Sequence, residues 1–262
     1  MKTIKNRRLM AMALLATLVV IPSLLQAQDT GDKKDNFKLS YTRSFEPFTV
    51  ANGDKAEGLA IDVLTAAFAK ANLKVIFVGV GQDEEQNSLT TGKVDGLVFF
   101  GVTPERKKTF DFSDPYLITG GALFTKAPNP TSSDLKDFEG KTVATPQKGP
   151  LAAYIKNKYP KITLITNVKD YQETLEAVLN EKAYAAALNT QVGAVLAQKL
   201  FPGKFSLPTK GYLEIPIGVA VTKGKQDFLL TKFNAGLKTI LSDGTYDGII
   251  AKWGVAQATK PM

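Results

Sequence analysis

Apolar and polar positions along the chain follow two periods, and these periods predict a series of strands and helices. Short apolar runs typical of strands occupy residues 37–41, 74–80, 97–100, 117–125, 141–145, 162–165, 184–188 and 213–221. Apolar positions at helical spacing occupy residues 58–72, 151–158, 171–180, 191–200, 227–242 and 249–253, with shorter helices expected within 82–91 and 134–138. Helices that alternate with strands at this spacing are typical of βαβ units, so we expect an α/β protein with parallel strands.

One stretch, residues 92–116, combines an apolar strand with a helix start of the sequence Thr103-Pro104-Glu105-Arg106. A helix N-terminus leaves backbone amides without partners and carries a partial positive charge. We expect Thr103 to cap this helix, and Arg106 to add a planar fork of donors that suits a carboxylate. The spacing alone also allows an arginine that simply pairs with a surface carboxylate.

Three motifs in this stretch, and two near the C-terminus, resemble the signature of the family 3 bacterial extracellular solute-binding proteins, the periplasmic receptors of polar amino acid ABC importers. They are Gly-Lys-Val-Asp from residue 92, Thr-Pro-Glu-Arg-Lys-Lys from residue 103, Asp-Phe-Ser-Asp-Pro-Tyr from residue 111, Leu-Ser-Asp-Gly-Thr-Tyr-Asp from residue 241 and Lys-Trp-Gly from residue 252. The resemblance covers residues 37–254.

The resemblance implies a fold of the type II periplasmic-binding-protein class, in which two α/β lobes, each a mixed sheet flanked by helices, are joined by two crossing strands. Lobe 1 would comprise residues 28–119 and 217–262, and lobe 2 residues 120–216. A ligand would be held in the cleft between the lobes, which closes on it like a Venus flytrap. Glycines 120 and 121, in a segment expected to cross between the lobes, can absorb the backbone change of a hinge.

The same resemblance assigns roles to residues of the cleft. Arg106 would grip a ligand carboxylate, and Phe45, in the loop after the first strand, would stack on the ligand. Beyond the resemblance, we expect that Arg43 in that loop either contacts a second anionic group or faces solvent. We also expect Glu214, with Asn189 and Thr190, to set the remaining polarity of the cleft.

Three departures from the family pattern bear on the ligand. Most relatives carry Gly-Ser-Thr where this chain has Gly149, Pro150 and Leu151, so that hydroxyl groups are lost while backbone amides remain. In relatives that bind α-amino acids, an aspartate commonly stands at the position of Thr190, which follows Asn189. Together these changes favour a carboxylate ligand that is less polar, or less cationic, than a standard amino acid.

The third departure replaces a Gly/Ser/Thr-rich edge with Phe99, Phe100 and Gly101 in a segment that is one residue shorter than usual. Either both phenylalanines are ordinary core residues, or one of them lines an apolar pocket. For Phe45 a ligand contact is the stronger expectation.

Composition narrows the possible chemistry. The 262 residues are 44% hydrophobic, which is enough to bury a sizeable core, and they include no cysteine and no histidine. Disulfides, thiol or imidazole metal ligation and Ser-His-Asp triads are therefore excluded. We expect no metal and no cofactor. The lysines are scattered, and no basic stripe with aromatic residues indicates nucleic-acid binding.

The N-terminal residues 1–27 have a basic start, an apolar run from Leu9 to Ile21 and a small residue, Ala27, which is typical of a cleaved signal peptide. An uncleaved membrane anchor is the alternative. Removal of these residues takes four positive charges from the formal net charge of +8 and leaves +4. Since no cysteine is present to carry a lipid, we expect the protein to diffuse freely in the periplasm. We also expect it to be a monomer.

We therefore expect a solute-binding protein, not an enzyme, which captures a small carboxylate and delivers it to the membrane subunits of an ABC importer. Two alternatives remain at this point. A cyclohexadienyl-dehydratase-like enzyme would need a general acid in the cleft, for which Glu214 is the only candidate, and a receptor could instead present its ligand to a sensor. The acidic run Asp83-Glu84-Glu85 is interpreted as a solvated helix face.

Overall fold

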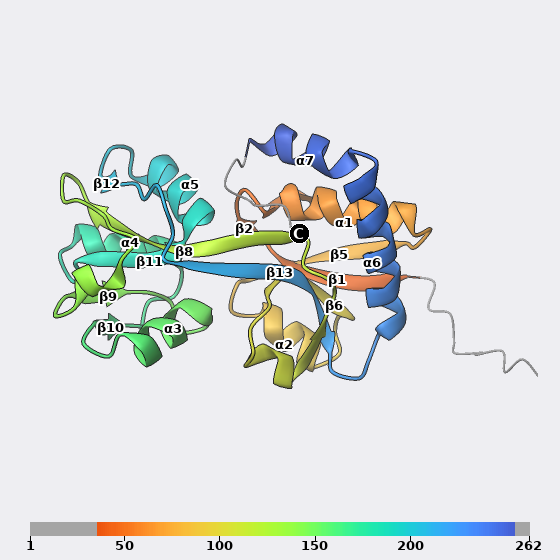
Figure 1. Ribbon diagram of the computed structural model, residues 1–262, viewed down its shortest axis with the longest axis horizontal. Coiled ribbons are helices and arrows are strands. Elements are labelled where there is room, and N and C mark those ends of the chain that lie inside the picture. Colours follow the sequence, from red (N-terminus) through yellow and green to blue (C-terminus); the bar gives the residue numbers. More distant parts are fainter. Residues whose placement is uncertain (1–35, 255–262) are drawn as a thin grey trace, which may run out of the picture. The chain divides into compact units, whose positions relative to one another are not determined.

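The computed structural model describes residues 36–254 (Figure 1). The signal peptide expected at residues 1–27 lies outside the described residues. The strands are β1 (Phe37–Thr42), β2 (Ser44–Phe45), β3 (Thr49–Asn52), β4 (Lys55–Glu57), β5 (Val75–Val80), β6 (Gly96–Gly101), β7 (Phe110–Phe112), β8 (Leu117–Lys126), β9 (Thr142–Ala144), β10 (Thr163–Ile165), β11 (Ala185–Asn189), β12 (Phe205–Ser206) and β13 (Leu213–Thr222).

The helices are α1 (Leu59–Lys70), α2 (Glu85–Thr90), α3 (Pro150–Lys158), α4 (Tyr171–Leu179), α5 (Thr190–Leu200), α6 (Asp227–Ser242) and α7 (Thr245–Trp253), with short 3-10 helices η1 (Arg106–Lys108) and η2 (Leu135–Phe138). Every strand and helix expected from the apolar pattern is present, with ends that differ by a few residues. No helix in the described part of the chain is long and apolar enough to cross a membrane.

The main sheet has the strand order β10-β9-β11-β8-β13-β6-β1-β5, with β12 paired to β8 and β7 paired to β13. Strand β1 runs parallel to both β5 and β6, and β9 runs parallel to both β10 and β11. The connections between these parallel strands contain helices, as the expected βαβ units require. The prediction of an α/β protein with parallel strands is therefore confirmed.

Two long strands connect the two parallel groups. Residues 117–121 of β8 pair with residues 213–217 of β13 in antiparallel register, and the rest of β8 pairs with β11. Beyond that pairing β13 lies antiparallel to β6. Figure 1 shows β8 and β13 passing from one group of elements to the other. Both strands are largely buried, so they form a rigid base for side chains at their middle.

Helices cover each group of strands and bury an apolar core. Helices α1, α6 and α7 pack together beside β1, β5 and β6, whereas α3, α4 and α5 contact the strands of the other group (Figure 1). At the contact of α1 with α6, a Cβ added at Gly236 would collide with the backbone oxygen of Ala67. The absence of a side chain at Gly236 therefore allows the two helices to approach closely.

Local capping explains where several helices begin. Asp170 accepts a hydrogen bond from the Glu173 amide (2.9 Å) at the start of α4, and Glu173 accepts one from the Lys169 amide (2.7 Å). Pro150 occupies the first turn of α3, where its missing N–H removes no intrahelical bond. These capping residues define where α3 and α4 begin, next to the cavity described below.

Two local predictions need correction. The short helix expected after Thr103 is a 3-10 helix of three residues, Arg106–Lys108, and it begins after Glu105 and not after Thr103. The segment after β1 was expected to be a loop, yet β2 pairs with β3, and β3 pairs with β4 around a turn at Gly53.

Candidate functional site

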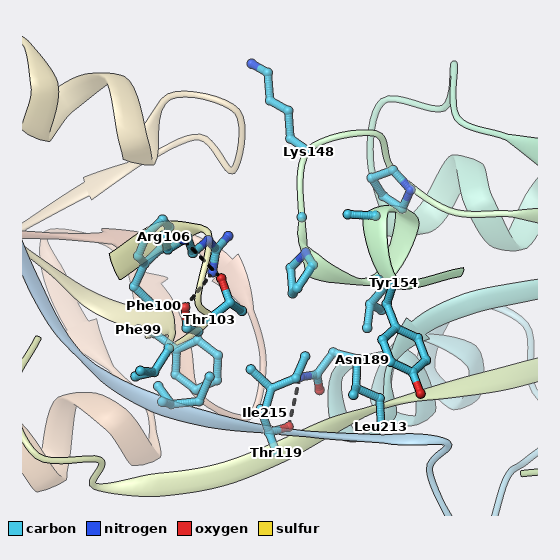
Figure 2. Close-up of a pocket in the computed structure, with 18 of the residues that line it drawn as sticks. Phe99, Phe100, Thr103, Arg106, Thr119, Lys148, Tyr154, Asn189, Leu213 and Ile215 are labelled. Carbon is cyan, nitrogen blue, oxygen red and sulfur yellow. Dashed lines mark hydrogen bonds between the residues drawn. The ribbon is translucent and has the colours of Figure 1, made fainter. Parts of the chain in front are cut away.

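A cavity of about 790 Å³ lies where the two groups of elements meet at β8 and β13. Its lining residues come from both groups, and Figure 2 shows Arg106, Thr103 and Phe100 on one side, with Tyr154, Asn189 and Leu213 on the other. We call the part formed by β1, β2, α2, β6 and η1 the Arg106 wall. The part formed by residues 145–158, Tyr171 and Asn189 is the Asn189 wall.

Arg106 is held in the cavity by the backbone around it. The Thr103 hydroxyl accepts a hydrogen bond from the Arg106 amide (3.3 Å), so Thr103 supports this turn although no regular helix follows. The guanidinium donates from Nη1 to the Gly101 carbonyl (3.1 Å), and its central carbon lies 3.7 Å from the centre of the Phe100 ring (Figure 2). This stacking restricts the guanidinium to one plane.

The guanidinium has no carboxylate partner within 4.0 Å in the part of the chain that the structure describes. Burial lowers the pKa of Arg106 to about 10, and the nearby Glu85 opposes this shift. The side chain is therefore cationic at neutral pH, and most of its five N–H donors remain available to a ligand. The alternative in which Arg106 pairs with a surface carboxylate is not what the structure shows.

Glu85, the first residue of α2, is a cavity residue that the sequence interpretation missed. Its Oε2 accepts a long hydrogen bond from the Thr42 hydroxyl (3.4 Å), whereas Oε1 is shielded from solvent and has no hydrogen-bond partner. Burial raises the pKa of Glu85 to about 8, although Arg106 and Thr42 both lower it. The neighbours Asp83 and Glu84 are exposed, so the solvated-face interpretation holds for them and is wrong for Glu85.

Only periodicity could have identified Glu85 in advance. The buried residues of α2 are Ser88 and Leu89, and Glu85 lies three and four positions before them, on the same helix face. The surrounding acidic run concealed this signal. Glu214, the acid named from the sequence, also lines the cavity, but it is exposed on β13.

Aromatic rings form the apolar part of the Arg106 wall. Phe45 and Phe99 both line the cavity, with ring centres 5.6 Å apart, and Tyr171 lies 5.6 Å from Phe45 on the opposite side. Phe48 is fully buried behind them and stacks on Phe99 at 4.6 Å. Phe100 is buried yet still lines the cavity beneath Arg106, so both phenylalanines at positions 99 and 100 face it.

The polar groups of Asn189 and Tyr171, both in the Asn189 wall, are engaged within the protein. The Asn189 side-chain oxygen caps α5 by accepting from the amides of Gln191 (3.1 Å) and Val192 (3.2 Å). Its amide nitrogen donates to the Thr119 hydroxyl (2.9 Å), which in turn donates to the Gln191 side chain (2.7 Å). The Tyr171 hydroxyl accepts a hydrogen bond from the backbone N–H of Asn189 (3.3 Å), and burial raises the pKa of Tyr171 to about 12.

The remaining residues named from the sequence are distributed as follows. Gly149 and Leu151 line the cavity at the start of α3, where Leu151 is 7% exposed. Thr190 is buried and does not line the cavity; its hydroxyl lies beside Gly211. Arg43 is exposed and lies against Gly79 of β5, outside the cavity. The structure therefore gathers every named residue except Arg43 and Thr190 around one cavity.

The described residues contain no group of three or more acidic side chains placed to hold a metal ion. What the cavity offers is one stacked guanidinium, one shielded carboxyl group and an aromatic surface. This arrangement suits a small molecule that combines a carboxylate with an apolar body.

Known proteins resemble this chain in sequence and in fold. The model of the bacterial extracellular solute-binding proteins, family 3, matches residues 37–256. The chain is 30% identical over 230 residues to the ABC transporter glutamine-binding protein GlnH of Bacillus subtilis (strain 168), covering 84% of this chain and 82% of that protein.

Two solved structures share the fold. An ancestral arginine-binding protein bound to glutamine superimposes with a TM-score of 0.73 at 27% identity, covering 84% of this chain and 98% of that one. A histidine kinase sensor domain with similarity to periplasmic binding proteins gives a TM-score of 0.77 at 22% identity, covering 86% and 98%, which shows the fold alone. The fold is therefore the two-lobed type II periplasmic-binding-protein fold.

Proposed function

The chain belongs to the bacterial extracellular solute-binding proteins of family 3, and from this premise we propose that it captures a small carboxylate-bearing ligand, an amino acid or a related organic acid. The observation that carries the proposal is the guanidinium of Arg106, which is stacked on Phe100 in the cavity and has no carboxylate partner among the described residues. A planar fork of unused donors in an apolar surrounding is a strong site for a carboxylate.

The ligand would lie between the two walls of the cavity. Its carboxylate would meet Arg106, with Gly101 and Thr103 holding the guanidinium in place, and its body would pack on Phe45, Phe99 and Phe100. The relatives named above include proteins that bind glutamine, which supports an amino acid as one class of ligand. Thr190 is buried and uncharged and does not line the cavity, which supports a ligand less polar, or less cationic, than a standard amino acid.

We further propose that lobe 1 comprises residues 28–119 and 217–262, and lobe 2 residues 120–216, with the cavity closing on the ligand as the lobes approach. The closed protein would deliver its ligand to the membrane subunits of an ABC importer. Residues 1–27 would direct export to the periplasm and be removed, leaving a monomer without a lipid anchor. The GlnH relative, an ABC transporter binding protein, supports the importer as partner.

Thermal-shift screening of the purified chain, followed by calorimetry, tests the proposal. The panel comprises glutamine, glutamate, arginine, histidine, leucine, succinate, 2-oxoglutarate and prephenate. We expect at least one acid to raise the melting temperature. The variant Arg106→Ala should lower the affinity for that acid on the order of 100-fold, because the carboxylate loses its charged partner in a dehydrated site. Arg43→Ala, an exposed arginine outside the cavity, is the matched control and should bind normally.

Two outcomes would contradict the proposal. If no acid in the panel binds, or if Arg106→Ala binds as tightly as the unchanged chain, Arg106 is not a carboxylate anchor. Conversion of prephenate to an aromatic product would support the dehydratase alternative, for which Glu85 offers an acid that burial keeps protonated at neutral pH.

A further inference from the structure

Glu85 is a buried carboxyl group to which the proposed function gives no role. It reaches the cavity from the first turn of α2, and its Oε1 atom has neither solvent nor a hydrogen-bond donor beside it. Within residues 36–254, the only donor to Oε2 is the Thr42 hydroxyl at 3.4 Å, near the upper limit for a hydrogen bond. An ionised carboxylate in this position would lack most of the donors that normally stabilise it, so its neutral form is favoured.

The charged group that acts most directly on Glu85 is Arg106, which faces it from η1 without forming an ion pair within 4.0 Å. Strand β1 contributes Tyr41 and the exposed Lys38, β6 contributes no titratable side chain, and β13 contributes only the exposed Glu214. Tyr116, at the end of the segment that leads into β8, is fully buried, and Glu85 helps to raise its pKa. Arg106 is therefore the main cation that favours the ionised form of Glu85.

A ligand carboxylate bound to Arg106 changes the surroundings that set the protonation of Glu85. It neutralises the cation that stabilises ionised Glu85, and it brings a second negative charge into the same cavity. It also displaces water from the cavity, which disfavours a second charge further. All three changes favour the protonated form of Glu85.

Resting on the proposed function, we propose that Glu85 is a positioning residue that is held neutral when Arg106 captures a ligand carboxylate, so that it takes up a proton from solvent wherever it was ionised before binding. The guanidinium then serves the ligand alone and is not shared between two anions. Glu85 acts through Arg106 and does not need to touch the ligand. The cavity therefore accepts one negative charge at a time, supplied either by Glu85 or by the ligand.

The direction of the pH dependence follows from this exchange. Below about pH 7 most Glu85 is already protonated, so binding takes up no proton and affinity does not change with pH. Above about pH 8, Glu85 of the ligand-free protein is mostly ionised and binding must add a proton. The dissociation constant of the ligand therefore rises by up to about tenfold per pH unit. A residue with a purely structural role would not produce this profile.

Calorimetry with the tightest-binding acid of the panel tests the inference at pH 6.0 and pH 8.5. Titrations at each pH in two buffers that differ in ionisation enthalpy, Mes and phosphate at pH 6.0 and Bicine and Tris at pH 8.5, give the number of protons taken up. We expect nearly none at pH 6.0 and about half a proton or more at pH 8.5 for the unchanged chain. Glu85→Gln should show none at either pH, with an affinity at pH 8.5 close to its value at pH 6.0. Glu84→Gln, an exposed neighbour, is the control and should match the unchanged chain.

A direct measurement covers the case in which Glu85→Gln fails to fold. With glutamate carboxyl carbons labelled with ¹³C, one resonance should titrate near pH 8 and move to higher pH when the ligand is added. An acid that binds in an Arg106-dependent manner, with equal proton uptake in the unchanged chain and Glu85→Gln, would overturn this inference and leave the proposed function intact. If no acid in the panel binds, the proposed function fails, and this inference fails with it.

Discussion

The two walls of the cavity differ in how their polar groups are used. On the Arg106 wall the guanidinium has no carboxylate partner within 4.0 Å among the described residues, and Glu85 keeps one oxygen without a donor. On the Asn189 wall, the side chain of Asn189 caps α5 and bonds Thr119, so it is already engaged. We propose that the Arg106 wall serves binding, at some expense of stability, and that the side chain of Asn189 on the opposite wall serves stability.

The largest expected effect is on stability, through Glu85. The pKa of this carboxyl is about 8 in the folded protein, against an ordinary value of 4.5, so between these pH values the folded chain holds a proton that the unfolded chain has lost. The free energy of unfolding therefore falls as pH rises from 4.5 to 8. Glu85→Gln does not titrate, and we expect it to be more stable than the unchanged chain by up to about 5 kcal/mol at pH 8.5.

Urea unfolding at pH 5 and pH 8.5 measures this difference. The gain of Glu85→Gln should be below about 1 kcal/mol at pH 5, because this pH lies only about half a unit above 4.5, where the unfolded chain begins to lose its proton. Glu84→Gln should show no comparable pH dependence. A Glu85→Gln variant less stable than the unchanged chain at pH 8.5 would mean that ionised Glu85 stabilises the Arg106 wall.

The next effect in size concerns the Asn189 wall. Asn189→Ala removes the cap of α5 and the hydrogen bond to Thr119, so we expect a loss of about 1–2 kcal/mol in the free energy of unfolding. Ligand affinity should change less than about threefold, because the side chain is engaged within the protein. Urea unfolding and calorimetry on one preparation give both numbers, with the exposed Asn180→Ala as control. A large loss of affinity at unchanged stability would reverse the roles assigned to the two walls.

The smallest effect is expected at the rim that connects the walls. Lys199 of α5 lies 3.2 Å from Glu46, which follows Phe45 in the chain, and the side chain of Lys199 is 60% exposed. Exposed ion pairs of this kind contribute little, so Lys199→Ala should change ligand affinity and stability by less than about 0.5 kcal/mol. Any difference should disappear in high salt. A larger effect that persists in 0.5 M NaCl would show that this rim holds the walls together.

The sequence was sufficient for most of the fold. Apolar periodicity placed the strands and helices because their buried faces are regular, as in α1 with Ile61, Leu64 and Phe68. It failed for the turn at Arg106, because a 3-10 helix of three residues has no periodic face and ends where β7 begins. The pairing of β2 with β3 was missed for a similar reason, since a two-residue strand has too few positions to show alternation.

For the site, the sequence predicted the residues of the Arg106 wall that carry recognisable motifs, such as Thr103 and Arg106. It could not predict that Glu85 turns inward, because adjacent acids on a helix have equal charge and only their packing distinguishes them. Nor could it show that Asn189 is engaged by Thr119, which lies 70 residues away in the chain. Such contacts depend on tertiary distances that local patterns do not contain.

The order of β13 in the chain has a consequence for how the molecule acquires its structure. Strand β6 lies between β1 and β13, yet β13 is the last strand, and all of residues 102–212 separate the two. A chain that emerges from the ribosome N-terminus first must therefore wait for residues 213–222 before β6 gains its second neighbour. Until then an apolar edge stays open, and non-local pairing of this kind makes a fold slow to complete. Synthesis is thus nearly finished before the part that carries Arg106 can assume its final form.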